Sequence, residues 1–515
     1  MEKKTKKIIY LSLFFISCIL ILFCISLSKS KTTKKEKIVN KTKNSTTYEE
    51  KDGRKKTIIY NANIRFEDEN GKLIDYDSSL IKSKKTEFAY ENKLGDSKVY
   101  LPTKISNHNK ILLTKDSDEI SLTPMIENQS TNIAVSNETS MNANNETVSI
   151  PTKATYKLEN ITYEYISEIN GLKENIILTK KPTSNIFEFK LSLTDNLIAE
   201  KSKITESILI KDRNSNELKA ILDSANMNDA TDNAYSENIT YSLKKSNDNE
   251  YTLKMVLDKN YLNSKKRVYP IIIDPSVSWN GDSNIIDTYI SNNSKYADIN
   301  FYDSGVTAFS MGYTSSMGTC RSLLKAIPLL NTVKNKSIKS AKLTMYETSS
   351  CDKNISVNAY RIIDDWTKTS VSWNTKPRYN VSEGKIGTTT TTGKLYAANV
   401  MDITTYVKNL SNTTHLNDYG LMLKLNSDTT SSAGYVKHFG SRHSNVNLQP
   451  KLTIEYYDAP TAPTNVSLSK SYLKLNESSI LSWNGISSYQ IDSVEYELLR
   501  LTLAELSQLE FLLSY

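Results

Sequence analysis

Short runs of alternating apolar and polar residues fill the chain between residues 58 and 457. This is the period of β-strands, in which successive side chains point to opposite faces of a sheet. From residue 287 to 457 the runs recur at about the 8–12-residue spacing of β-sandwiches. The pattern predicts a mainly β protein: a β-rich region over 58–280, followed by a sandwich module over 281–457.

Three stretches depart from this pattern. Residues 126–150 are rich in Asn, Ser and Thr and nearly free of large side chains, which predicts a spacer. Residues 458–498 begin with a proline-marked linker and return to strand alternation. Residues 499–515 are Leu-rich and suit a helix, which makes them an atypical tail. We expect residues 459–515 to be poorly folded, because an incomplete sandwich exposes its strand edges.

The amino terminus carries a targeting signal. Four lysines within residues 1–7 precede an uncharged run over 8–27, which is long enough to cross a bilayer core of about 30 Å as a helix. The lysines place the amino terminus in the cytoplasm and the rest of the chain outside. Two interpretations of residues 1–29 stay open, an uncleaved membrane anchor and a cleaved signal peptide. Residues 30–57 follow as a basic, polar linker.

The formal net charge of +8 belongs to this amino-terminal part. Residues 1–60 carry 15 Lys and Arg against 5 Asp and Glu, which leaves 50 against 52 for the rest. The near-neutral remainder gives no support for a nucleic-acid partner and suits a neutral-sugar ligand. Glycine is scarce, at 15 residues of 515, and no phosphate-binding glycine motif is present.

Two of the four cysteines, Cys320 and Cys351, lie outside the apolar run. They flank two strand-like runs, 321–327 and 340–347. If these strands pair antiparallel, the two cysteines come together and a disulfide is plausible in an exported protein. The alternative is a pair of free thiols.

Residues 284–457 resemble the DNRLRE (disaggregatase-related) family, which is grouped with carbohydrate-binding modules. The resemblance is distributed over segments in the family's order: 287–290, 321–325, 340–346, 357–361, 366, 371–374 with Pro377, 402–404, 417–424 and 450–456. It implies a jelly-roll-like β-sandwich. One departure is Tyr396, in a strand where relatives often carry Trp.

The upstream part resembles the amino-terminal region of bacterial wall-associated and Rhs (YD-repeat) surface proteins. The segments that carry this resemblance are 66–75, 171–178, 227–230 and 269–275. Residues 463–498 are similar to the start of a fibronectin type III-like domain, about 40 residues where such sandwiches need about 100. The repeats and toxin of the larger Rhs relatives are absent from this sequence.

The aromatic residues of the sandwich module are its best candidates for ligand binding. Sugar rings expose apolar faces that stack on Trp or Tyr, while their hydroxyls need polar partners. The candidates are Trp366, Trp373 and the neighbouring pairs Tyr360–Arg361 and Arg378–Tyr379. Packing within the core is the alternative role for both tryptophans, and ordinary surface positions for the two pairs. Asp287 and Asp303 are weak candidates for a structural calcium site.

No catalytic constellation is visible in the sequence, so an enzyme acting on glycans is the least favoured hypothesis. The first hypothesis is a non-catalytic surface or secreted protein that binds cell-wall or extracellular polysaccharide. The second is the truncated stalk of an Rhs or wall-associated toxin-delivery protein, with a structural role. Sequence downstream of the gene would separate them, because out-of-frame YD repeats would indicate truncation.

Overall fold

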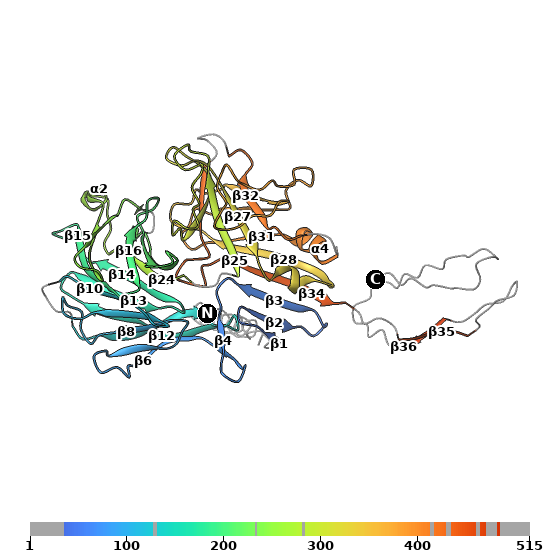
Figure 1. The fold of residues 1–515 in the computed structure, drawn as a ribbon, viewed down its shortest axis with the longest axis horizontal. Coiled ribbons are helices and arrows are strands. Elements are labelled where there is room, and N and C mark those ends of the chain that lie inside the picture. The colour runs from blue at the N-terminus through green and yellow to red at the C-terminus, as the bar shows by residue number, and fades with distance from the viewer. Residues whose placement is uncertain are drawn as a thin grey trace, which may run out of the picture.

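The computed structural model describes residues 36–126, 131–231, 234–280, 284–412, 417–428, 434–459, 464–469 and 481–484. Most of these residues form two β-sandwiches side by side (Figure 1). The mainly β fold predicted from the sequence is confirmed. The helices within the described residues are short: α2 (Lys259–Asn263), α3 (Leu329–Val333) and α4 (Thr404–Asn412).

The upstream sandwich consists of an eight-stranded and an eleven-stranded antiparallel sheet. The strands of the first are, in order, β21 (Thr240–Lys245), β22 (Glu250–Val256), β15 (Ile186–Leu193), β10 (Asp118–Pro124), β9 (Ile111–Lys115), β8 (Lys98–Leu101), β7 (Tyr90–Leu94) and β6 (Asp77–Lys82). The second runs β11 (Ala134–Met141), β12 (Thr147–Lys157), β13 (Ile161–Ser167), β14 (Gly171–Leu178), β24 (Ser276–Trp279), β18 (Leu218–Leu222), β17 (Ile208–Asp212) and β16 (Leu197–Lys201), with β19 (Met227–Asp229), β20 (Tyr235–Ser236) and β23 (Ile271–Ile273) beside it. One hydrophobic core fills the space between the two sheets.

The second sandwich has a six-stranded and a seven-stranded sheet. The six-stranded sheet runs β1 (Lys37–Lys41), β2 (Ser45–Glu49), β3 (Lys55–Tyr60), β34 (Lys451–Asp458), β28 (Lys336–Tyr346) and β31 (Ala398–Asp402). The seven-stranded sheet runs β30 (Gly387–Thr390), β29 (Ser356–Arg361), β32 (Leu421–Leu425), β27 (Gly318–Ala326), β26 (Ala308–Thr314) and β33 (Tyr435–Phe439), with β25 (Ile285–Ser291) paired to β27. Their shared core includes Ile59 from the amino-terminal part of the chain.

The prediction of a linker over residues 30–57 is wrong from residue 37 onward. β1, β2 and β3 form an antiparallel meander, and β3 pairs along its length with β34 (Figure 1). Lysines are common on strands at the edge of a sheet, where they oppose edge-to-edge association. β1 is such an edge strand, and its lysines gave this part the composition of a linker.

The predicted spacer over residues 126–150 is also largely ordered as strands. Residues 134–141 and 147–157 form the hairpin β11–β12, whose turn contains Asn145 at φ 54°. The side chains of β11 are mostly exposed or half-buried, so its strand lacks the apolar alternation that marks a buried one.

The two strand-like runs that flank the cysteines do not pair. β27 lies in the seven-stranded sheet and β28 in the six-stranded sheet, across the core from each other. Cys320 and Cys351 are both buried free thiols. The antiparallel pairing on which the disulfide prediction depended is therefore wrong.

Other predictions fall on the ends of the chain. No helix among the described residues is long and apolar enough to cross a membrane. Residues 8–27, the predicted anchor or signal, lie outside the described residues, as do residues 499–515. Within 458–498 the structure describes the short pair β35 (Thr464–Leu468) and β36 (Leu481–Asn484), and the fibronectin-like character stays a prediction.

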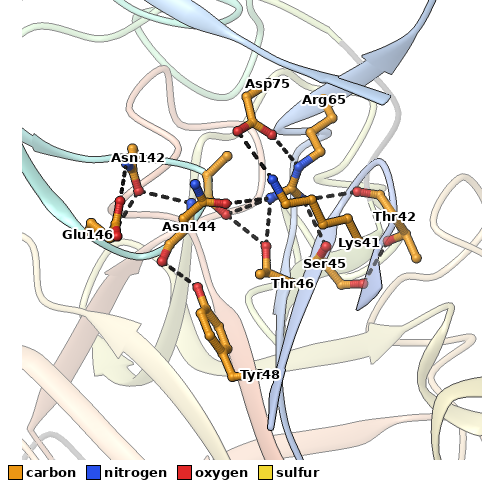
Figure 2. Close-up of polar contacts among 11 residues, drawn as sticks. Lys41, Thr42, Ser45, Thr46, Tyr48, Arg65, Asp75, Asn142, Asn144 and Glu146 are labelled. Carbon is orange, nitrogen blue, oxygen red and sulfur yellow. Dashed lines mark hydrogen bonds and ion pairs between the residues drawn. The ribbon is translucent and has the colours of Figure 1, made fainter. Parts of the chain in front are cut away.

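Arg65 fastens the amino-terminal meander to the upstream sandwich (Figure 2). It begins β4 (Arg65–Glu67), which pairs with β5 (Leu73–Asp75), and its side chain is fully buried. Its guanidinium donates to the Asp75 carboxylate, the carbonyl groups of residues 42, 45 and 143, and the hydroxyl of Thr46. All five of its N–H donors are thereby satisfied.

We expect Arg65→Ala to lower the free energy of unfolding by about 3 kcal/mol, because it leaves buried acceptors without a donor. Urea unfolding followed by tryptophan fluorescence measures the change. Arg65→Lys should recover little of the loss, since an ammonium group cannot reproduce the five-donor geometry. Arg378→Ala is the matched control, because that arginine is exposed in an ion pair with Asp364. Equal midpoints for Arg65→Ala and the control would contradict this role.

Candidate functional site

The outer face of the seven-stranded sheet carries a second, small hydrophobic cluster. Along β27 the side chain of Leu324 enters the main core, whereas Leu323 points to the other side of the sheet. The segment after β29 crosses this outer face. The buried members of this outer cluster are Ile290, Leu323, Ile362, Val371 and Met422. The partly buried rings of Trp366, Trp373, Tyr379 and Tyr419 pack against them.

Both tryptophans predicted from the sequence belong to this cluster. The indole N–H of Trp366 donates to the carbonyl oxygen of Tyr419 at 2.7 Å, which fixes the ring on the sheet. The ring of Trp373 lies beneath two cations, with Arg321 at 5.1 Å and Lys376 at 4.5 Å from its centroid. Both tryptophans are half-buried, so part of each side chain stays exposed.

The tyrosines of the two predicted pairs meet on the same face, and their arginines do not. The Tyr360 and Tyr379 rings lie 5.1 Å apart, and Lys424 lies 5.3 Å from the Tyr360 centroid. Arg361 instead donates to Glu383 at 2.7 Å. Successive residues of a strand point to opposite faces, which separates Arg361 from Tyr360.

Arg378 forms an exposed ion pair with Asp364, its side chain being 78% exposed. Hydrogen bonds from Arg378 hold the pKa of the Asp364 carboxyl at about 2. The structure thus brings four of the six predicted residues together and leaves both arginines in ion pairs of their own.

The sequence did not reveal the charged residues that surround these rings. Arg321 forms an ion pair with Asp428 at 2.7 Å, and Asp428 is buried, its side chain being 4% exposed. Lys424 lies 4.0 Å from the same carboxylate. Burial lowers the pKa of both Lys424 and Lys376. Strand alternation places Arg321 and Leu323 on one face, but only the fold shows which residues lie opposite.

This face carries an excess of positive charge. Cationic side chains lie over its rings from two strands, β27 and β32, and from the crossing segment, and Asp428 lies within ion-pair distance of two of them. These cations are Arg321, Lys325, Lys376 and Lys424. A ligand that reaches the rings therefore meets both apolar ring surface and hydrogen-bond donors of positive charge.

The two carboxylates predicted as calcium ligands both face an arginine. Asp287 accepts a hydrogen bond from the backbone N–H of Ser441 at 2.6 Å. The buried Arg442 guanidinium lies near Asp287 and Asp303, and 3.4 Å from the ring centroid of Tyr302. The part of the chain that the structure describes contains no group of three or more metal-ligating side chains.

Comparison with known proteins agrees with the architecture of this module. Residues 282–456 match the model of carbohydrate-binding module family 96. The predicted carbohydrate-binding character of this part of the chain is therefore confirmed at the level of a family model. The finer resemblances to DNRLRE and Rhs proteins stay predictions.

The curated relatives include two nucleases. They are the tRNA(Glu)-specific nuclease WapA of Bacillus subtilis subsp. natto (strain BEST195) and the tRNA nuclease WapA of Bacillus subtilis (strain 168). Each is 25% identical over 243 residues, covering 42% of this chain and 10% of the relative. The chain thus spans about a tenth of these relatives' length.

A solved glycoside hydrolase family 81 structure from Clostridium thermocellum covers 78% of this chain and 40% of its own. It shares 7% identity at a TM-score of 0.16, too weak a likeness to carry any argument.

We expect Asp287→Asn to flatten the dependence of stability on pH. Burial raises the pKa of Asp287 from 3.8 to about 7 in the folded protein. The folded state therefore holds this proton more tightly than the unfolded state, and the resulting stability is lost as pH rises from about 4 through 7. Urea unfolding at pH 4, 5.5, 7 and 8 measures the slope.

Burial also raises the pKa of Glu174 to about 7 and that of Glu168 to about 8. These two groups therefore add to the fall in the free energy of unfolding as pH rises. Asp287→Asn should reduce the decline without abolishing it. The exposed Asp365→Asn serves as the control and should retain the parent slope. If the free energy of unfolding of Asp287→Asn depends on pH as steeply as that of the parent, Asp287 does not have the raised pKa on which this prediction depends.

Proposed function

We propose that this protein is a non-catalytic binder of polysaccharide and that the outer face of its seven-stranded sheet is the binding surface. The match of residues 282–456 to a carbohydrate-binding module family supports the class of ligand. The observation that carries the choice of surface is the cluster of partly exposed rings, Trp373, Tyr360 and Tyr379, held on one face by a buried apolar base.

The charge of this face favours an acidic polysaccharide. The four cations over the rings outnumber the two carboxylates that interact with them, Asp428 and Asp418. Guanidinium and ammonium groups donate charge-assisted hydrogen bonds to carboxylate or phosphate groups along a glycan chain. The neutral-sugar ligand expected from the overall charge of the modules fits this local surface less well.

A surface of this kind suits cell-wall or extracellular polysaccharide and a location outside the cell. The module match and the similarity to the WapA proteins support this weakly, and the exported location expected from residues 1–29 agrees with it.

The second candidate is a structural role as the stalk of a longer surface protein. Similarity to proteins about ten times the matched length supports it. In that case the same face would attach the longer protein to a wall polymer, so the two candidates share one binding surface.

We expect Trp373→Ala to weaken binding to an acidic polysaccharide about tenfold or more. The substitution removes a ring surface for the sugar and the cation–π contacts that hold Arg321 and Lys376 over it. Affinity electrophoresis of the full chain through gels containing polygalacturonate measures retardation, with laminarin as the neutral comparison. Polygalacturonate binding should weaken as salt is raised.

Lys245→Ala is the control, since it removes a positive charge from an exposed ion pair of the upstream sandwich, on β21. Circular dichroism of each variant checks the fold. Parent-like retardation of Trp373→Ala, or no retardation by any polysaccharide tested, would overturn the proposal.

A further inference from the structure

A cavity of about 270 Å³ lies at the seam between the two sandwiches. The upstream sandwich contributes Asp223, Glu237 and Asp274 to its wall, and the second sandwich contributes Thr307 and Tyr396 among others. Its volume lies near the lower end of the roughly 300–1,000 Å³ typical of small-molecule sites, which favour domain interfaces. This cavity is separate from the ring cluster on the outer face.

Polar contacts across the seam fix the walls of the cavity. Lys437 of β33 forms an ion pair with Glu237 at 3.1 Å, and Ser350 donates to the same carboxylate. The hydroxyl of Thr307 donates to Asp223 at 2.6 Å. Because both sandwiches are held through these contacts, the cavity is formed before any ligand arrives, which lowers the entropic cost of binding.

One wall of the cavity is aromatic. The Tyr396 ring stacks on Phe439 at 5.7 Å and 19°, and its residue is 42% exposed. Its backbone has φ 64°, a conformation that is rare for a large side chain. The buried Glu347 carboxylate holds the preceding segment by accepting from the backbone N–H groups of residues 392, 393 and 394. Lys173 lies 5.6 Å from the ring centroid and donates to the tyrosine hydroxyl at 3.4 Å, and the rest of the ring lines the cavity.

The carboxylates around the cavity differ in their partners. Glu237 is paired with Lys437, Asp274 with Lys173 at 3.0 Å, and Glu206 with Lys201 at 2.6 Å. Asp223 accepts from the uncharged donors Thr307 and the Ser224 backbone N–H. No cation within the described residues lies at ion-pair distance from it. A carboxylate in this position is stabilised by a ligand that brings a positive charge.

We propose that this cavity binds a single amino-sugar residue, with the sugar ring against Tyr396 and its ammonium group on Asp223. The aromatic wall suits the apolar face of a pyranose ring, and the surrounding carboxylates and hydroxyls suit its hydroxyl groups. The proposal does not depend on the polysaccharide site of the outer face, because it uses different residues and a differently charged ligand.

Binding to Asp223 depends on pH in a defined direction. Burial raises the pKa of the Asp223 carboxyl to about 6, so acid removes the charge that receives the ammonium. The other charged or titratable groups that line the cavity are Glu206, Glu237, Asp274, Lys437, His443 and the tyrosines 289, 396 and 435. Burial lowers the pKa of His443 to about 4, which keeps it neutral above pH 5. Affinity should therefore fall about tenfold from pH 7 to pH 5.

Isothermal titration calorimetry of the full chain with glucosamine tests the proposal. We expect glucosamine to bind at pH 7, and N-acetylglucosamine and glucose to bind at least tenfold more weakly, since neither carries an ammonium group. Asp223→Asn should lose at least tenfold in affinity and most of the pH dependence. Tyr396→Ala, at an exposed ring, should also weaken binding and provides a second variant if Asp223→Asn fails to fold.

Trp373→Ala is the control that separates the two sites. It should bind glucosamine like the parent while losing polysaccharide binding, and Asp223→Asn should show the reverse. The proposal is overturned if glucosamine does not bind the parent chain, if it binds Asp223→Asn equally well, or if the three sugars bind alike.

Discussion

The antiparallel pairing of β3 with β34 joins two distant parts of the chain, residues 55–60 and 451–458, in one sheet. Six residue pairs are in register, from Lys55 opposite Tyr456 to Tyr60 opposite Lys451. Ile59 of β3 is buried in the same core as Ile454 of β34. Without β3, strand β34 would expose a row of unpaired backbone groups and part of that core, which is a surface prone to aggregation.

This pairing determines how the rest of the protein is held. The chain leaves the second sandwich after β3, builds the whole upstream sandwich, and returns at β25 to finish the second one. The hydrogen bonds of Arg65 join the amino-terminal meander to the upstream sandwich. The ion pair of Glu237 with Lys437 joins the two sandwiches at a second place. The cavity at the seam exists because both sandwiches are fastened at several points.

The sequence predicted the features that depend on local alternation. Strands such as β34, with alternate residues buried, follow from the apolar period, and the tryptophans of the outer face stood out by residue type. The meander over residues 37–57 was missed for two reasons: the edge strand β1 exposes most of its side chains, and the buried positions of β2 are mostly Ser and Thr, which give no apolar pattern.

The partners of the aromatic residues could not be predicted for a different reason. Arg321, Lys424 and Asp428 meet at Trp373 and Tyr360 through strand pairings between distant parts of the chain. The register of those pairings is set by the core on the other face of the sheet. The cavity at the seam depends in the same way on how two separately folded cores are joined.

Disulfide trapping across β3 and β34 tests the shared sheet most directly. Lys56 and Glu455 are directly opposite in register, and such pairs lie within reach of a disulfide. The double variant Lys56→Cys with Glu455→Cys should form the cross-link under mild oxidation, as shown by peptide mapping. Lys56→Cys with Ile454→Cys should not, because residue 454 points into the core. Failure of the first pair to cross-link, or equal cross-linking of both, would contradict the account.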